Sequence, residues 1–403
     1  MKNSNLHIFN PSCETAIANG TVSYLPNKTL QTFENDLAFL PSIFSKNDDL
    51  ILMPKYEELQ HLEILHSLGF PVPGQILQTD FFDQHQKIIS EIEQYKLWGW
   101  SPNWIHRLKK NTNISCPKFE KSTFYNWDTS HKKLYSRTTA KEILETILRQ
   151  NPNSIYIDKK LIPSKLTTIT EIEAFLVEHQ QIVLKEPWSS SGRGIIMLRK
   201  NTLNQSITQR INGVLKQQNY IMAEPMLNKQ LDMALHFKIK NQQVSFIGDT
   251  YFQTNSNGQY QANYLNQVPN IDKRLLDFIE KNKNQLIDNL ILSLSESKIN
   301  INYEGFLGVD VMLIEQNNNL FFQPCVEINL RNNMGTIALH IQKIIHPKAK
   351  GIFNVVFNPK ARFETTYQQE NHKASTLDGL FYKGTLALVS PKGKQFGAYI
   401  NLI

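Results

Sequence analysis

Apolar and polar positions near the N-terminus follow the pattern of an open α/β domain. Residues 6–10 and 49–53 are short apolar runs typical of buried strands, and residues 60–68 have helical spacing and stop before Gly69. Strand, loop, helix and strand in this order predict a parallel sheet, whose ligands bind beyond the carboxyl ends of its strands. The loop at 10–15 is therefore expected at the ligand edge of that sheet.

The rest of the chain mixes both periods, as an α+β region does. The spacing predicts helices over 138–149, 170–179, 202–217, 272–297 and 336–345. It predicts strands over 181–184, 195–198, 233–240, 244–252, 308–314, 320–330, 384–390 and 395–402. Residues 114–131 have no clear period, which is consistent with a linker.

A lysine and a glycine-rich loop follow the predicted strand at 181–184. Lys185 ends that apolar run, where an ammonium can reach phosphate oxygens as a point charge. Gly192 and Gly194 allow successive N–H groups to converge on an anion, and three serines add hydroxyl donors. The spacing is neither that of a P-loop nor that of the dinucleotide fingerprint. Taken alone, this segment is equally explained as a hairpin turn with a serine-glycine tip.

A second group of polar residues lies on the predicted strand pair at 308–314 and 320–330. Asp310 is the only polar side chain in 309–314, and burying such a carboxylate without a partner is costly. Alternation along the second strand puts Glu327 and Asn329 on one face, together with Cys325. Two carboxylates and an amide oxygen form a hard ligand set that suits magnesium bound to a phosphate substrate. The two groups together predict an ATP-magnesium site.

These residues resemble the ATP-grasp superfamily, which includes D-alanine:D-alanine ligase, glutathione synthetase and biotin carboxylase. The resemblance covers about residues 141–340 and rests on Lys185 with the Ser-Ser-Gly-x-Gly loop, and on Gly-Val-Asp310 followed by Glu327-x-Asn329-x-Arg331. It implies an α/β N-terminal, pre-ATP-grasp-like domain followed by an α+β ATP-grasp core of two subdomains, with the nucleotide bound between their sheets. The expected division is an N-terminal domain at 1–118, a linker at 119–135, a lid subdomain at 136–227, a metal-binding subdomain at 228–350, and C-terminal strands packed on the core at 351–403.

The resemblance also implies roles for individual residues. It makes Lys185 the phosphate-binding lysine, and it makes Arg331 the group that steadies the transferred phosphoryl or acyl-phosphate, so these two are the catalytic candidates. The mobile lid over the triphosphate would be Ser189, Ser190, Ser191, Gly192, Arg193 and Gly194. Glu224 and Met226 belong to the strand that contacts the adenine and ribose, and Asp232 matches a ribose contact if one extra residue is allowed in the spacing. Asp310, Glu327 and Asn329 match the magnesium ligands.

The chemistry implied by the resemblance is ATP-dependent ligation with ATP and Mg²⁺ as cofactors. A small-molecule or peptide carboxylate would be activated as an acyl-phosphate and attacked by a nucleophilic co-substrate, with carbon-nitrogen bond formation as the expected outcome. Two alternatives stay open: a phosphotransferase (kinase) on the same fold, and a non-catalytic ATP-binding module.

Composition agrees with an enzyme of two or three domains. The chain has 403 residues, of which 41% are hydrophobic, and no long apolar run, so no membrane association is expected. The start lacks a secretory signal and the three cysteines are far apart, which predicts a cytoplasmic protein without disulfides. The net charge of +7 comes from scattered lysines with no aromatic-basic module, so no nucleic-acid partner is expected. A homo-oligomer is compatible with the sequence.

Two features have no role in this scheme. Cys13 lies beside Glu14 but has no histidine that the sequence places next to it, which predicts an inert thiol. Three tryptophans occur within 98–104, where they either pack as a plug between domains or line a substrate pocket.

Overall fold

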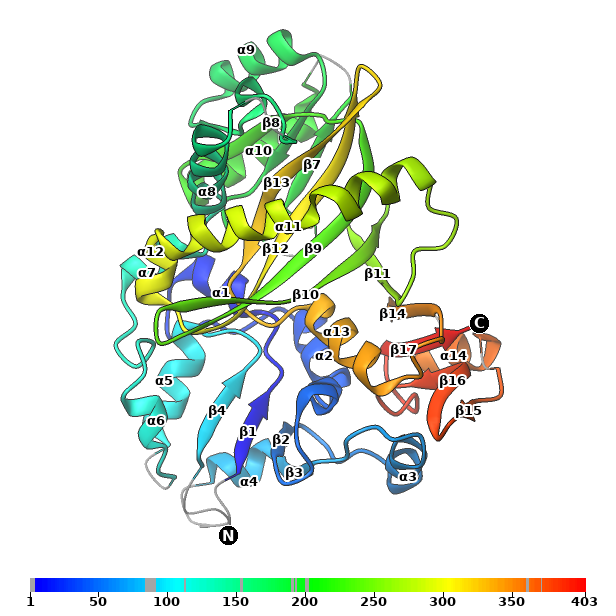
Figure 1. The fold of residues 1–403 in the computed structure, drawn as a ribbon. Helices are drawn as coiled ribbons and strands as arrows, with labels where there is room; N and C mark the ends of the chain where they lie inside the picture. The colour runs from blue at the N-terminus through cyan, green and yellow to red at the C-terminus, as the bar shows by residue number, and fades with distance from the viewer. Residues whose placement is uncertain are drawn as a thin grey trace. The chain divides into compact units, whose positions relative to one another are not determined.

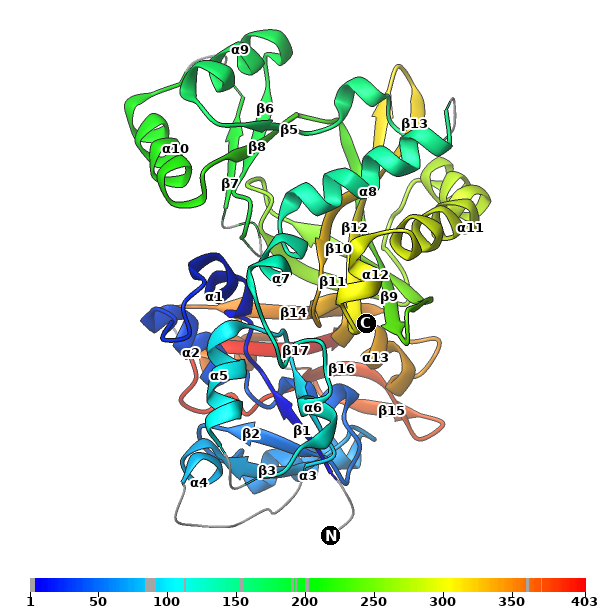
Figure 2. The same ribbon diagram turned by 90° about the vertical axis from the view of Figure 1, so that its left-hand side faces the viewer.

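The structure is a computed structural model that describes residues 4–83, 92–111, 114–152, 155–189, 192, 194–199, 203–359, 362–370 and 372–403. The chain divides into two compact units. The first contains Met1–Trp127, Gln261–Val268 and Arg331–Ile403, and the second contains Asp128–Tyr260 and Pro269–Leu330. Figures 1 and 2 show the elements of both units. None of the described helices is long and apolar enough to span a membrane.

The first unit begins with a parallel four-stranded sheet in the order β3-β2-β1-β4. Its strands are β1 (Asn5–Ile8), β2 (Leu50–Met53), β3 (Gly74–Leu77) and β4 (Gln94–Leu97). The helices of this part are α1 (Cys13–Asn19), α2 (Lys28–Asp36), the 3-10 helix Leu40–Phe44, α3 (Leu59–Ser67), α4 (Gln78–Phe82), α5 (Pro102–Lys110) and α6 (Pro117–Glu120). The two central strands each bury three of their four residues, as expected for a sheet covered on both faces.

The same unit contains antiparallel strands in the order β11-β14-β17-β16-β15, and Figure 2 shows the last four side by side. They are β11 (Tyr260–Leu265), β14 (Gly351–Phe357), β15 (Ser375–Leu377), β16 (Leu380–Ala387) and β17 (Phe396–Leu402), with helices α13 (Met334–Ile344) and α14 (Phe363–Glu370). One continuous apolar cluster joins Phe39 and Trp98 of the first sheet region to Ile337 of α13 and Phe353 of β14. This shared core makes the N-terminal and C-terminal segments a single folding unit.

The second unit contains a small antiparallel sheet in the order β5-β8-β6-β7. Its elements are β5 (Ser164–Leu166), β6 (Ile182–Lys185), β7 (Ile195–Leu198), β8 (Ile221–Pro225) and the helices α9 (Ile169–His179) and α10 (Gln205–Gln218). Thr168 and Glu171 form a capping box that starts α9, and Asn204 caps α10. Both helices pack on the sheet through a compact apolar cluster that includes Ile172 and Ile211.

The long strands of the second unit have the order β13-β12-β9-β10, and neighbouring strands among them are antiparallel. Its elements are α7 (Thr129–Leu134), α8 (Arg137–Gln150), the 3-10 helix Lys159–Leu161, β9 (Lys229–Lys240), β10 (Gln243–Thr254), α11 (Lys273–Ser295), α12 (Lys298–Asn302), β12 (Gly305–Gln316) and β13 (Asn319–Asn329). Helix α8 packs against β13, and α11 packs against α8 and β10. In Figure 1, α11 crosses the long strands of this sheet.

The predicted helices and strands are found, with ends that shift by at most four residues. The helix expected at 202–217 starts at Gln205 because the Asn204 side chain accepts a hydrogen bond from the N–H of Ile207 and so fixes the first turn. The aperiodic segment at 114–131 contains α6 and the start of α7, helices too short to show a period. The division into five segments stays a prediction.

Candidate active site

The predicted phosphate-binding lysine lies at the end of a fully buried strand. All four residues of β6 are buried, and only 6% of Lys185 is exposed. A buried ammonium needs a partner, and Glu224 of the neighbouring strand β8 forms an ion pair with it. The register places Lys185 opposite Met222 and Val183 opposite Glu224. Two residues singled out for the nucleotide are thus in direct contact.

The predicted lid joins β6 to β7 as a hairpin connection. The N–H of Glu186 donates to the carbonyl of Gly194 at 2.9 Å, which closes the base of the loop. Gly192 has a φ of +73°, in the left-handed region that favours glycine. At Gly194 a Cβ atom would overlap the Ser189 hydroxyl, so this position excludes larger residues. Ser190, Ser191 and Arg193 lie outside the described residues.

The predicted magnesium ligands lie on two adjacent antiparallel strands. Asp310 of β12 is opposite Glu327 of β13, and Gly308 is opposite Asn329, so the two carboxylates are cross-strand partners. The ladder has an irregularity just beyond Asp310, where β13 contains Pro324 and cannot donate to its neighbour. The strand pair therefore brings Asp310, Glu327 and Asn329 to one end of the hairpin.

The surroundings of this strand pair have the electrostatics of an acidic site. Burial, followed by the charges of Asp310 and Glu327, raises the pKa of the Cys325 thiol well above its usual range. The described residues contain no group of three or more His, Cys, Asp or Glu side chains arranged to hold a metal. The predicted ligand set of two carboxylates and the Asn329 amide stays a prediction, in which the remaining oxygens would come from water and phosphate, as magnesium prefers.

An arginine that the sequence analysis missed joins the two predicted groups. Nη1 of Arg137, in the first turn of α8, lies 3.0 Å from Oε2 of Glu327. Its Nε donates to the carbonyl of Glu186 at 3.0 Å, and its Nη2 lies 3.5 Å from Oγ of Ser189. One guanidinium therefore contacts three parts of the candidate site, which are the backbone after Lys185, the first residue of the lid and a predicted metal ligand. A cation in the first turn of a helix interacts unfavourably with the helix dipole. The position of Arg137 at the start of a predicted helix was therefore the sequence signal that its side chain has a role outside the helix.

The residues predicted to contact the adenosine are held by the long strand β9 and the segment before it. The N–H of Met226 donates to the carbonyl of Gln181 at 2.9 Å, so Met226 can offer its carbonyl or side chain to a ligand but not this N–H. Asp232 of β9 pairs with Lys229 at 2.5 Å and accepts from Oγ1 of Thr254 at 2.9 Å. Lys229 and Thr254 thus fix the orientation of the Asp232 carboxylate.

Arg331, the second catalytic candidate, begins a segment of the first unit. Its Nε donates to Oε1 of Glu14 at 2.8 Å, and its Nη1 donates to the carbonyl of Asn332 at 3.1 Å. Its side chain is 10% exposed. In sequence Arg331 follows Asn329 by two residues, and the boundary between the two units falls between them.

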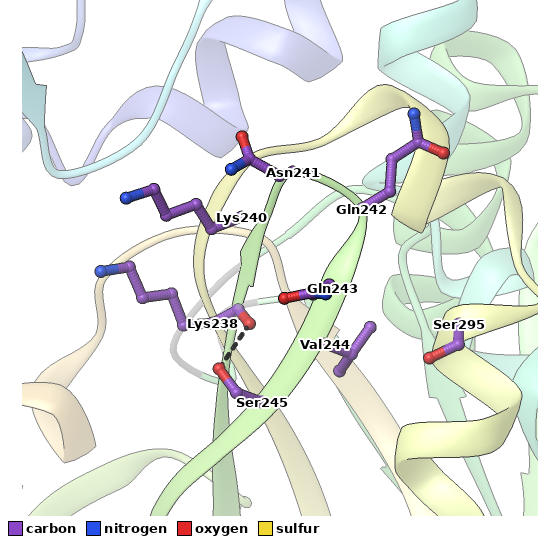
Figure 3. A pocket seen from close by; sticks show the side chains of 8 residues that line it. All are labelled: Lys238, Lys240, Asn241, Gln242, Gln243, Val244, Ser245 and Ser295. Carbon is purple, nitrogen blue, oxygen red and sulfur yellow. Dashed lines mark hydrogen bonds between the residues drawn. The ribbon is translucent and has the colours of Figure 1, made fainter.

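A separate hollow of about 760 Å³ lies at the hairpin that joins β9 to β10 (Figure 3). It is lined by Lys238, Lys240, Asn241, Gln242, Gln243, Val244, Ser245 and Ser295. The two lysine side chains extend from the same side of the hairpin in Figure 3. None of the predicted site residues lines this hollow.

No family model matches the chain, and no curated protein matches its sequence. Solved structures do match its fold. An ADP complex of the N5-carboxyaminoimidazole ribonucleotide synthetase PurK has a TM-score of 0.50 and 11% identity, with 100% of this chain and 92% of that chain covered. A pyruvate carboxylase from Rhizobium etli has a TM-score of 0.53 and 10% identity, with 99% of this chain and 35% of that chain covered.

A related synthetase from Staphylococcus aureus with ADP has 15% identity and a TM-score of 0.48, covering 100% of this chain and 94% of that chain. At these identities the matches show the fold alone. The two matches with TM-scores of 0.50 and 0.53 confirm the predicted fold class, an α/β N-terminal region followed by an α+β core.

Proposed function

We propose that this chain, which has the ATP-grasp fold, is an ATP- and magnesium-dependent ligase that activates a carboxylate for attack by an amine or similar nucleophile. The observation that carries the proposal is the position of Arg137. Its guanidinium bonds both to the backbone next to Lys185 and to Glu327, so the cationic strand end and the acidic strand pair lie within reach of one side chain.

The charges of this site suit a magnesium-bound triphosphate. Lys185 and Arg137 are cations held in largely buried positions, where electrostatic interactions with phosphate are stronger than in water. Their present partners, Glu224 and Glu327, neutralise them and prevent an unpaired buried charge. Asp310, Glu327 and Asn329 would hold magnesium, which when bound supplies positive charge to the phosphate oxygens.

The reaction would proceed in two balanced steps. A carboxylate oxygen attacks the γ-phosphorus of ATP, which gives an acyl-phosphate and ADP. The amine then attacks the acyl carbon, phosphate leaves, and a proton is released as the amide forms. The protein residues would position the reactants and stabilise negative charge, with no protein nucleophile required. Closure of the 189–194 lid would exclude water, which matters because an acyl-phosphate hydrolyses.

The test is an ADP-release assay over pools of carboxylates and amines, with product analysis. A ligase releases orthophosphate together with an amide-linked product. A stable phosphorylated product would instead indicate the phosphotransferase, and ATP binding without ADP formation from any pool would indicate a non-catalytic module. Lys185→Ala and Glu327→Ala are the controls, and activity that survives in both variants would refute the proposed site.

A further inference from the structure

The carboxyl ends of β1 and β4 form a tightly connected edge in the first unit. The side chain of Asn10, in the loop after β1, donates to the carbonyl of Gly99 at 2.7 Å and accepts from the N–H of Gly99 at 3.3 Å. Gly99 directly follows Trp98, whose backbone N–H continues the pairing with Ile8 at 2.8 Å. The loop after β1 is thus fixed to the segment after β4, at the edge where open α/β sheets bind ligands.

The segment that begins with Arg331 is attached to the same edge. The N–H of Asn332 donates to the carbonyl of Trp98 at 2.9 Å, and its side-chain amide donates to the carbonyl of Leu97 at 3.4 Å. Asn332 therefore fixes the backbone beside Arg331 against the end of β4. The guanidinium at the end of the long Arg331 side chain needs a further constraint to take one position, because the side chain has several rotatable bonds.

Close packing beside Gly99 brings Arg331 next to the start of α1. A Cβ atom on Gly99 would overlap the sulfur of Cys13 and come within 3.2 Å of Cβ of Arg331. Only a residue without a side chain allows Cys13 and Arg331 to approach the backbone this closely. Burial raises the pKa of Cys13 to about 12, which agrees with a packing role for this thiol.

Glu14 supplies a side-chain constraint on the guanidinium, in addition to the carbonyl of Asn332 that accepts from Nη1 at 3.1 Å. Its Oε1 accepts from Nε of Arg331 at 2.8 Å, and both side chains are 10% exposed. Oε2 of Glu14 is buried without a hydrogen-bond partner among the described residues. Burying a carboxylate in this position costs desolvation free energy unless the arginine offsets its charge. The pairing with Arg331, and not solubility at the surface, therefore accounts for Glu14.

We propose that Glu14 is a positioning residue for Arg331, which it orients for the phosphoryl or acyl-phosphate group. The proposal rests on the proposed function, because the phosphoryl or acyl-phosphate group that Arg331 is predicted to steady occurs only in such a reaction. A pair separated by 317 positions in sequence would then couple the first turn of α1 to the chemistry. A misplacement of about 1 Å in such a group costs about 100-fold in rate.

The experiment compares Glu14→Gln and Glu14→Ala with Glu57→Gln in the full chain. Glu57 is a suitable control because it forms another buried ion pair of the same unit, with Lys394. The readouts are kcat and KM for ATP, with the carboxylate and amine that give ADP release in the screen, and the thermal midpoint. We expect kcat to fall about 10-fold in Glu14→Gln and about 100-fold in Glu14→Ala, with KM for ATP unchanged. Glu57→Gln should lower the thermal midpoint and leave kcat near wild type.

A double-mutant cycle distinguishes positioning from folding. In an Arg331→Lys background, Glu14→Gln should cost much less in kcat than in wild type, because the group that Glu14 orients has already been changed. Equal kcat for wild type and Glu14→Gln, an equal loss in Glu57→Gln, or additive effects in the cycle would each overturn the proposal while ligase activity stands. If Arg331→Ala is fully active, Arg331 has no task in the reaction and this inference fails while the proposed function stands. If the wild type releases no ADP from any pool, the proposed function and this inference both fail.

Discussion

Replacement of Arg137 by methionine tests whether this residue connects the two halves of the candidate site. The Arg137 side chain is 6% exposed and Glu327 is 21% exposed, so the ion pair between them is largely shielded from water. Its loss removes a charge-assisted hydrogen bond of roughly 1.5–3 kcal/mol, and the unpaired carbonyl of Glu186 adds roughly 1 kcal/mol. Because Glu327 is partly exposed, water can replace part of its interaction with Arg137. We therefore expect the free energy of unfolding to fall by about 3 kcal/mol. For a unit of roughly 200 residues this lowers the thermal midpoint by roughly 6–12 °C.

The assay is thermal and urea unfolding of Arg137→Met beside Arg210→Met. Arg210 is a matched control because it lies in the same unit and pairs with Glu186 at 3.8 Å, but it is 45% exposed. An exposed pair of this kind contributes roughly 0–1 kcal/mol, so Arg210→Met should unfold close to wild type. If the two variants unfold at the same midpoint, Arg137 does not have the structural importance inferred from its contacts.

Two further predictions concern the lid and the stability of the first unit. Gly194→Ala would place a methyl group against the Ser189 hydroxyl, and we expect the affinity for MgATP in a calorimetric titration to fall about 10-fold or more; unchanged affinity would refute a close-packed lid base. Burial, followed by the charge of Lys394, lowers the pKa of His61 to about 4. Because only the unfolded state takes up the proton between about pH 6.5 and pH 4, the free energy of unfolding should fall by about 2 kcal/mol from pH 7 to pH 5 on this account. His61→Leu should remove this dependence of the free energy of unfolding on pH, as measured by urea unfolding at each pH. The same pH dependence in wild type and His61→Leu would contradict the prediction.

The local parts of the candidate site could be predicted from the sequence. The end of β6 at Lys185, the turn with Gly192, and the strands that contain Asp310 and Glu327 were all expected, because they depend on the alternation of neighbouring side chains and on the backbone freedom of glycine. A polar residue within an apolar strand was also a reliable signal, since burial without a partner is costly. These features are short in range, and the chain near each residue is sufficient to determine them.

The tertiary structure decided the contacts between distant segments. Arg137 is adjacent to no predicted site residue in sequence, yet the packing of α8 on β13 brings its guanidinium to Glu327 and to the backbone beside the lid. The pairing of Glu14 with Arg331 depends in the same way on the packing around Gly99. Periodicity specifies which face of an element is buried and does not specify which element covers it. The sequence by itself therefore determined the elements and the chemistry they carry, and the packing of the core determined which of those side chains meet.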